Sequence, residues 1–292
     1  MEIQQLRYLV AVARTKNFSR AAEQCHVSQP SLSQQIMKLE EELGERLLER
    51  GRREAKLTEA GRLFLPHAER VLDEVEAGRD VVNAMRGVVR GRVMLGVIPT
   101  VAPYYLPRVL RAFAKAHPEI EVSITEATTS ELVRAVQAGE LDVGLVSLPV
   151  AVRGLVAEEV FAEALWLALP KRHPLAKRDA VKMAELAEEP FMLLQDGHCL
   201  AGQSLEFCAM RGFAPKVTFR SAQMETIQAF VAAGMGVSMV PTMARREGAG
   251  VVYRPLHGRT PERKIGFIRA EGRVASQAVR ALTEFVRVRG GE

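Results

Sequence analysis

The stretch that decides the N-terminal fold is Phe18-Ser19-Arg20-Ala21-Ala22-Glu23-Gln24-Cys25-His26-Val27-Ser28-Gln29-Pro30-Ser31-Leu32-Ser33-Gln34-Gln35-Ile36. It predicts one helix over residues 20–25 and a second over residues 29–43. We expect Ser19 and Ser28 to be their N-caps, because a serine hydroxyl accepts a hydrogen bond from the free N–H groups of a first turn. Two helices joined by a turn of about three to four residues form a helix-turn-helix unit.

Regular segments continue on both sides of this unit. Upstream, apolar residues between Ile3 and Ala13 recur with the 3.6-residue period of a helix. Downstream, the basic segment 46–57 has Gly51 between two short extended arms, as expected of a wing. Taken alone, the same charge run is more typical of a solvated loop. Its position directly after a helix-turn-helix favours the wing.

A long helix is predicted from its N-cap Thr58 to about Met85. One face carries an apolar stripe, which favours pairing with a second copy of the chain. Packing onto its own domain is the alternative. Residues 87–91 are predicted to be a hinge. The stripe consists of Ala68, Leu72, Val75, Val82 and Met85.

From Val93 onward, short apolar strands alternate with helices. This alternation predicts an α/β architecture with mostly parallel sheets. Two sheets, with the chain crossing between them twice, would leave a cleft for a small ligand. The expected strands are 93–98, 120–126, 142–147, 164–169, 191–194, 217–220, 237–240, 252–254 and 264–268, and the expected helices are 104–116, 131–138, 200–210, 223–233 and 276–288.

The composition is that of an ordinary globular chain with a mild excess of positive charge. Of 292 residues, 48% are hydrophobic and 26% charged, with a net charge of +5, which permits nucleic-acid binding. The start has no basic segment followed by an apolar one, and no stretch approaches the roughly 18 apolar residues of a membrane span. We therefore expect a cytoplasmic protein without membrane contact. Three cysteines exclude a structural disulfide framework, so any disulfide would be transient.

The helix-turn-helix interpretation assigns chemistry to particular residues. A recognition helix presents its first residues to base edges in the major groove, where Gln can read adenine and Ser several bases. Basic side chains around it would make salt-sensitive phosphate contacts. Short helix pairs also occur as plain scaffolding. The predicted DNA-binding residues are Ser28, Gln29, Pro30, Ser31, Ser33 and Gln34 for bases, and Arg20, Lys38, Arg50, Arg52, Arg53 and Lys56 for phosphates.

The same stretch, continued by Leu39–Gly44 and Leu57–Gly61, resembles the N-terminal motif of LysR-type transcriptional regulators. The resemblance extends over the whole chain and implies an α+β multidomain fold. Its parts would be a winged helix-turn-helix domain (1–60), a linker helix for dimerisation with a hinge (58–90), and a two-lobed α/β regulatory domain like periplasmic binding proteins (91–292). Lobe I would comprise about 91–162 and 268–292, and lobe II about 163–267.

Cys199 lies directly before the predicted helix 200–210, and Cys208 lies within it. Nine helical residues would separate them by about 13.5 Å of rise, on opposite faces. A disulfide needs Cα atoms about 4.4–6.8 Å apart, so the pair could bond only if the helix is dismantled. The helix start favours a thiolate at Cys199. Buried inert cysteines are the alternative, and a zinc site with His198 would need the same disruption.

Within the LysR family the chain is similar to the peroxide-sensing members, at residues 98–101, 126–129, 196–200 and 207–208. That resemblance implies that Cys199 reacts with peroxide to give sulfenic acid and that Cys208 resolves it to a disulfide. Ala201 and Gly202 depart from the pattern by replacing larger polar residues, and Asp196 and Gln203 are expected to order the loop. The residues implied for the peroxide pocket are Thr100, Thr129, His198 and Arg263.

The sequence therefore predicts a LysR-type activator of oxidative-stress genes that is switched by hydrogen peroxide. Its expected partners are double-stranded operator DNA, hydrogen peroxide, RNA polymerase, and further copies of itself in a homotetramer. No cofactor, metal or enzymatic activity is expected. Two alternatives remain: a LysR-type regulator that binds an organic effector between its lobes, and a thiol peroxidase.

Overall fold

In the computed structural model, the described residues are 1–49, 55–84, 89–246, 248, 250–258 and 260–289. The chain divides into two compact units. One comprises Met1–Val89 with Gly272–Gln277, and the other comprises Arg90–Glu271 with Ala278–Glu292. Each unit is built around its own hydrophobic core.

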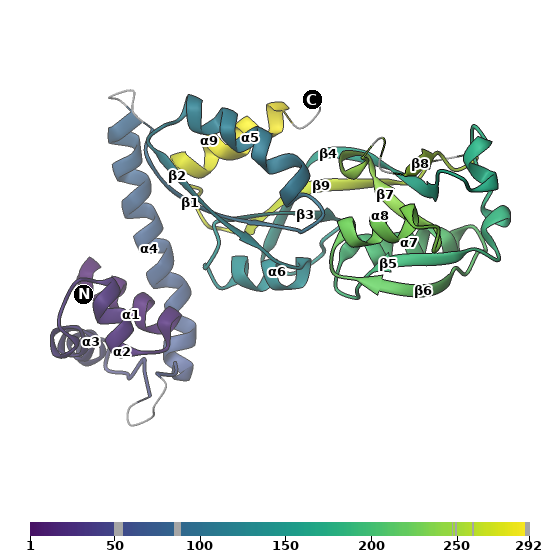
Figure 1. Cartoon of the computed structure of the whole chain (residues 1–292). Helices are drawn as coiled ribbons and strands as arrows, with labels where there is room; N and C mark the ends of the chain where they lie inside the picture. Colours follow the sequence, from purple (N-terminus) through teal and green to yellow (C-terminus); the bar gives the residue numbers. More distant parts are fainter. Residues whose placement is uncertain (50–54, 85–88, 247, 249, 259, 290–292) are drawn as a thin grey trace. The chain divides into compact units, whose positions relative to one another are not determined.

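The N-terminal unit begins with three short helices, α1 (Ile3–Thr15), α2 (Phe18–Gln24) and α3 (Gln29–Leu43) (Figure 1). Their apolar faces meet in one cluster that includes Leu9, Leu32 and Leu39, all fully buried. Cys25 is half-buried against this cluster, and burial raises the pKa of its thiol.

The cap of α3 is confirmed and that of α2 is corrected. Ser28 Oγ accepts a hydrogen bond from the Ser31 N–H at 3.3 Å, as predicted. The predicted cap Ser19 is instead inside α2. Asn17 takes that place, because its Oδ1 accepts from the N–H groups of Ser19 (2.9 Å) and Arg20 (3.1 Å).

The two arms of the predicted wing are present. Leu48 and Leu57 form an antiparallel bridge, and the Glu49 N–H donates to the Lys56 carbonyl at 2.8 Å. The buried Glu40 carboxylate holds the first arm by accepting from the N–H groups of Leu47 (2.8 Å) and Leu48 (3.1 Å). The predicted tip at Gly51 lies outside the described residues.

The long helix α4 (Glu59–Ala84) starts as predicted, with Thr58 Oγ1 accepting from the Gly61 N–H at 3.0 Å. Gly61 permits close packing, because a Cβ there would lie 2.0 Å from the Leu47 carbonyl oxygen. Ala68 and Leu72 pack onto the N-terminal core, whereas Val82 is 55% exposed. The first half of the predicted stripe therefore serves its own domain. Ion pairs Arg7–Glu76 (3.0 Å) and Arg14–Glu69 (3.4 Å) add further links to α1.

The second unit has two lobes. The first lobe contains strands β1 (Gly91–Val97), β2 (Ile120–Glu126) and β3 (Val143–Leu148), with helices α5 (Ala102–Ala116), α6 (Thr129–Gln137) and α9 (Gln277–Arg289). The second lobe contains β5 (Pro190–Leu194), β6 (Lys216–Ser221), β7 (Ser238–Pro241) and β8 (Val251–Arg254), with α7 (Cys199–Met210) and α8 (Met224–Ala232). Short 3-10 helices span Pro174–Lys177, Met183–Leu186 and Thr242–Ala244.

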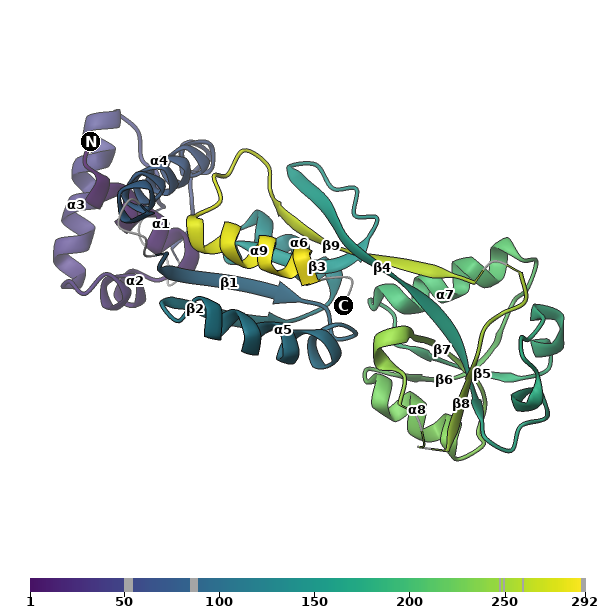
Figure 2. The same ribbon diagram turned by 90° about the horizontal axis from the view of Figure 1, so that it is seen from above.

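Two long strands, β4 (Leu155–Pro170) and β9 (Glu262–Ala270), connect the lobes as an antiparallel pair (Figure 2). They give the strand order β2-β1-β3-β9-β4-β7, with β8 also on β4. The crossing between lobes is as predicted, but the expectation of mostly parallel sheets is wrong. Among the named strands of the described residues, β1–β2, β1–β3 and β5–β6 pair in parallel, whereas every pairing of β4 or β9 is antiparallel.

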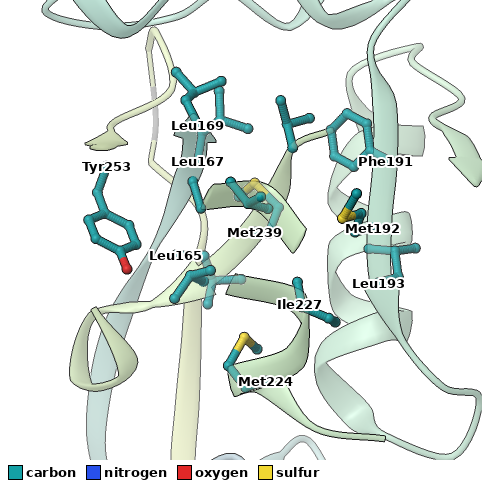
Figure 3. Close-up of a cluster of buried hydrophobic side chains, with 14 of the residues drawn as sticks. Leu165, Leu167, Leu169, Phe191, Met192, Leu193, Met224, Ile227, Met239 and Tyr253 are labelled. Atoms are coloured by element: carbon teal, nitrogen blue, oxygen red, sulfur yellow. The ribbon is translucent and has the colours of Figure 1, made fainter. Parts of the chain in front are cut away.

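The core of the second lobe lies between α7, α8 and the strands, where Phe191, Ile227 and Met239 converge (Figure 3). Full burial of one such side chain contributes about 1.5–3 kcal/mol. This core therefore fixes the face of α7 that carries Leu200 and Ala201, each 2% exposed. Among the described residues, no helix is long and apolar enough to cross a membrane.

Candidate functional site: a two-cysteine helix and a buried arginine

Both cysteines of interest lie in α7, which is one uninterrupted helix. Cys199 is its first residue and is half-buried. Cys208 lies two and a half turns further on and is 1% exposed. Burial raises the pKa of the Cys208 thiol to about 11, so this sulfur stays protonated at neutral pH. The two thiols are free and differ in accessibility.

The loop before α7 lies close to the start of α6 at Gly197. Gly197 has φ +97°, and a Cβ there would lie 3.8 Å from the Thr128 methyl carbon. Asp196 anchors the loop through an ion pair with Arg220 at 2.8 Å. His198 is the N-cap, and burial lowers its pKa while the Glu126 carboxylate acts in the opposite direction. His198 is therefore mainly neutral at pH 7.

Thr100 and Arg263, two of the residues predicted for the peroxide pocket, contact each other directly. The Arg263 side chain is fully buried, and its Nη1 donates to Thr100 Oγ1 at 2.7 Å while Nη2 donates to the Thr100 carbonyl at 3.1 Å. Glu163 holds the other edge of the guanidinium, with Oε1 2.8 Å from Nε and 2.7 Å from Nη2. Within the described residues, Arg263 makes no hydrogen bond to Cys199.

Thr129, the first residue of α6, supplies another polar group. Its Oγ1 is buried and has no hydrogen-bond partner among the described residues. Such a hydroxyl costs free energy unless a ligand or water satisfies it. The neighbouring Thr128 hydroxyl is already used, because it donates to the Glu131 carboxylate in the cap of α6. Thr129 thus has hydrogen-bonding capacity to spare.

Gln203 ties α7 to the first lobe. Its Nε2 donates to Ser147 Oγ at 2.9 Å and to the Leu148 carbonyl at 3.2 Å, both at the end of β3. The next residue, Ser204, points its hydroxyl into an apolar layer, where it has no partner among the described residues. The helix that carries both cysteines is therefore held by Gln203 and weakened at Ser204.

The predicted DNA-binding residues form an exposed face on α2 and α3. The buried side of α3 carries Leu32, Ile36 and Leu39, so its other side is open. Ser33 is half-buried. Arg50, Arg52 and Arg53 lie outside the described residues. The exposed members are Arg20, Ser28, Gln29, Pro30, Ser31, Gln34, Lys38 and Lys56.

The helix-turn-helix face and the two-lobed domain with its buried polar groups define a DNA-binding transcription regulator with its own regulatory domain. The chain belongs to the LysR family. Residues 3–62 match the bacterial regulatory helix-turn-helix protein, lysR family, and residues 86–290 match the LysR substrate binding domain. As a member of this family it is a transcription regulator and not an enzyme, which sets aside the thiol peroxidase alternative.

Within the family the chain is similar to OxyR proteins. It is 38% identical over 292 residues to the DNA-binding transcriptional dual regulator OxyR of Escherichia coli (strain K12), covering 99% of this chain and 96% of that protein. A probable hydrogen peroxide-inducible genes activator of Mycobacterium avium is 39% identical over 240 residues, or 82% and 77% of the two chains. Full-length OxyR C199D from Pseudomonas aeruginosa superimposes with a TM-score of 0.81 at 29% identity, covering 99% and 95%.

Sequence reasoning did not single out Glu163, the partner of Arg263. A signal was present, because Glu163 is a carboxylate directly before the predicted apolar strand 164–169. Among the described residues, no group of three or more His, Cys, Asp or Glu side chains is placed to hold a metal ion.

Proposed function

We propose that the chain is a hydrogen-peroxide-responsive regulator of the OxyR type, with Cys199 as the reactive thiol. The observation that carries the proposal is the placement of two free thiols in one helix, with Cys199 half-buried at its start and Cys208 fully buried near its end. Relatives that are 36–39% identical, named hydrogen peroxide-inducible genes activators, support it.

The proposed chemistry has two steps. The Cys199 thiolate attacks one oxygen of hydrogen peroxide, an S–O bond forms, the O–O bond breaks, and hydroxide leaves and is protonated to water. Sulfur is thereby oxidised to sulfenic acid and peroxide is reduced. The Cys208 thiol then attacks the oxidised sulfur, which forms the disulfide and releases a second water. Thr100, Thr129, His198 and Arg263 would surround the peroxide.

The second step requires α7 to open. Nine helical residues place the two Cα atoms about 13.5 Å apart along the axis, whereas a disulfide holds them within about 4.4–6.8 Å. Loss of the helix removes Gln203 from Ser147 and Leu148, so the α7 segment would no longer be tied to β3. The bond between two sulfurs would in this way change the shape of the regulatory domain.

The regulator would act as a homotetramer on operator DNA, in the bacterial cytoplasm and in contact with RNA polymerase. Dimers would pair through α4 and assemble further through the regulatory domain. Val82, exposed near the end of α4, remains available for such pairing. Reduced and oxidised tetramers would place their DNA-binding domains differently and so give different footprints.

The test is to titrate reduced protein with peroxide, count free thiols, and map linked peptides by mass spectrometry. A Cys25→Ser variant removes the third thiol, so that loss of two thiols reports on Cys199 and Cys208 alone. We expect one equivalent of peroxide to produce a Cys199–Cys208 link and a changed DNA footprint. Retention of both thiols, or identical footprints before and after, would contradict the proposal.

A second candidate is a LysR-type regulator with a small organic effector. A hollow of about 490 Å³ favours it, since it has the size of a small-molecule pocket and is lined by Phe207 and Met210 of α7 and by Pro261 before β9. On this alternative, Cys199→Ser would leave the transcriptional response intact. Loss of the response in Cys199→Ser would exclude it.

A further inference from the structure

Glu163 is a buried carboxylate that the mechanism above does not use. It lies on β4 where the chain passes from one lobe to the other, and its side chain is 8% exposed. One oxygen, Oε1, binds Arg263 at both Nε and Nη2. The other, Oε2, accepts from the Met243 N–H at 2.9 Å in the 3-10 helix that follows β7. The carboxylate is fully engaged and fixed in place.

The guanidinium of Arg263 is in turn almost fully used. Its Nε donates to Glu163, its Nη1 and Nη2 donate to Thr100, and Nη2 also lies 2.7 Å from Glu163 Oε1, so all three nitrogens of the guanidinium have a partner. A guanidinium can grip a carboxylate at the edge formed by Nε and Nη2 or at the edge formed by Nη1 and Nη2. Glu163 occupies the first edge and Thr100 the second, so neither is open to an organic acid. The net charge of the buried pair is zero, so the pocket has little attraction for anions.

This arrangement also decides what Thr100 can do. Its Oγ1 accepts a hydrogen bond from a cationic donor, so its own O–H is left to donate elsewhere. Thr100 is 2% exposed, and among the described residues its hydroxyl donates to no other group. A hydroxyl that donates to a bound peroxide would stabilise the negative charge that develops on its departing oxygen.

We infer that Glu163 is a positioning residue: a carboxylate built into the protein that orients Arg263, makes Thr100 a hydrogen-bond donor, and excludes organic acids in favour of a small neutral oxidant. The inference rests on the proposed function and adds a cause for its specificity. The regulatory domain matches a family described as substrate binding, yet in this chain its buried arginine is closed to carboxylate ligands. The carboxylate of Glu163 accounts for this difference.

The test uses the full-length chain with Cys25→Ser and Cys208→Ser, so that Cys199 is the sole thiol. We would measure two rate constants side by side, one for oxidation by peroxide and one for alkylation by iodoacetamide. Iodoacetamide is a neutral reagent that needs no hydrogen-bond donor from Thr100. Displacement of catalytic groups by about 1 Å can cost up to 100-fold, so we expect Glu163→Ala to slow oxidation by roughly 10- to 100-fold. Alkylation should stay close to that of the parent.

Chemical rescue separates positioning from a general structural effect. Acetate can enter the space vacated in Glu163→Ala and should restore much of the oxidation rate, whereas acetamide, a neutral molecule of the same shape, should not. Glu163→Gln serves as the second variant in case the alanine variant does not fold, as checked by circular dichroism. It should oxidise slowly and gain nothing from acetate, because its amide fills the space.

The inference is wrong if Glu163→Ala or Glu163→Gln reacts with peroxide as fast as the parent, or if oxidation and alkylation slow equally and acetate has no effect. Failure of the proposed function would look different, since the parent protein itself would then not be oxidised at Cys199. The two failures are therefore distinguishable in one experiment.

Discussion

Gln203→Ala should accelerate disulfide formation without changing the reaction with peroxide. The variant removes the hydrogen bonds from Nε2 to Ser147 Oγ and to the Leu148 carbonyl. Each such bond contributes about 1 kcal/mol net. Ordering a glutamine side chain costs conformational entropy, and the alanine variant avoids this cost, which offsets part of the loss. The cost is up to about 1.5–2 kcal/mol for a fully immobilised side chain. Gln203 is half-buried, so we expect α7 to open about 1 kcal/mol more easily. That corresponds to roughly a fivefold larger open population.

Two measurements on the same variant check this value. Hydrogen exchange of the α7 amides should become about fivefold faster, in proportion to the open population. Conversion of sulfenic acid to disulfide, followed by quenching with a thiol reagent, should accelerate by a similar factor. Alanine favours helix slightly more than glutamine does, so intrinsic propensity acts against the expected direction.

Glu206→Ala is the matched control, because Glu206 is exposed on the same helix and makes none of these contacts to β3. It should leave both rates near those of the parent. The reasoning is refuted if Gln203→Ala leaves α7 exchange unchanged, or if exchange accelerates while disulfide formation does not. The second result would mean that opening of α7 does not limit the bond between Cys199 and Cys208.

Three further predictions concern other parts of the chain. Ser204→Ala should slow both α7 exchange and disulfide formation, because it removes a buried hydroxyl that has no partner among the described residues and that costs about 1–3 kcal/mol; faster exchange would contradict this. The free energy of unfolding should fall as the pH rises from about 9 to 11, since the unfolded chain then releases the Cys208 proton while the folded chain retains it. Denaturant titrations at the two pH values should show a smaller fall for Cys208→Ala. Lys38→Ala should weaken binding to all DNA sequences alike and reduce the slope of log K against log salt by about 0.9, if Lys38 contacts one phosphate; an unchanged slope would remove Lys38 from the interface.

Local features of the fold could be predicted well from the sequence. The strand 120–126 has the predicted bounds, and α7 begins one residue before its predicted start. These segments are defined by apolar periodicity and by caps, which are properties of neighbouring residues. The cap of α2 was misassigned because Asn17 and Ser19 are both good capping residues, and only the observed bonds to Asn17 distinguish them.

Long-range features could not be predicted from these patterns. The first half of β4 was missed because Glu158, Glu159 and Glu163 interrupt its apolar pattern, and this half is defined by its pairing with β9. The same pairing made the sheet mixed instead of parallel. Glu163 and Arg263 are separated by 100 positions, so no local pattern could predict their pairing. The residues proposed for the peroxide pocket were expected only through resemblance, and Glu163 was not among them.

The close contact at Gly61 has a mechanical consequence for regulation. No side chain separates α4 from the Leu47 backbone, and ion pairs from Arg7 and Arg14 join α1 to the same helix. Helices α1 to α3 and the long helix therefore resist twisting against one another. A torque applied to the far end of α4 would rotate the recognition helix by the same angle, so in the proposed pair of copies small rotations would be enough to change which stretch of DNA fits both.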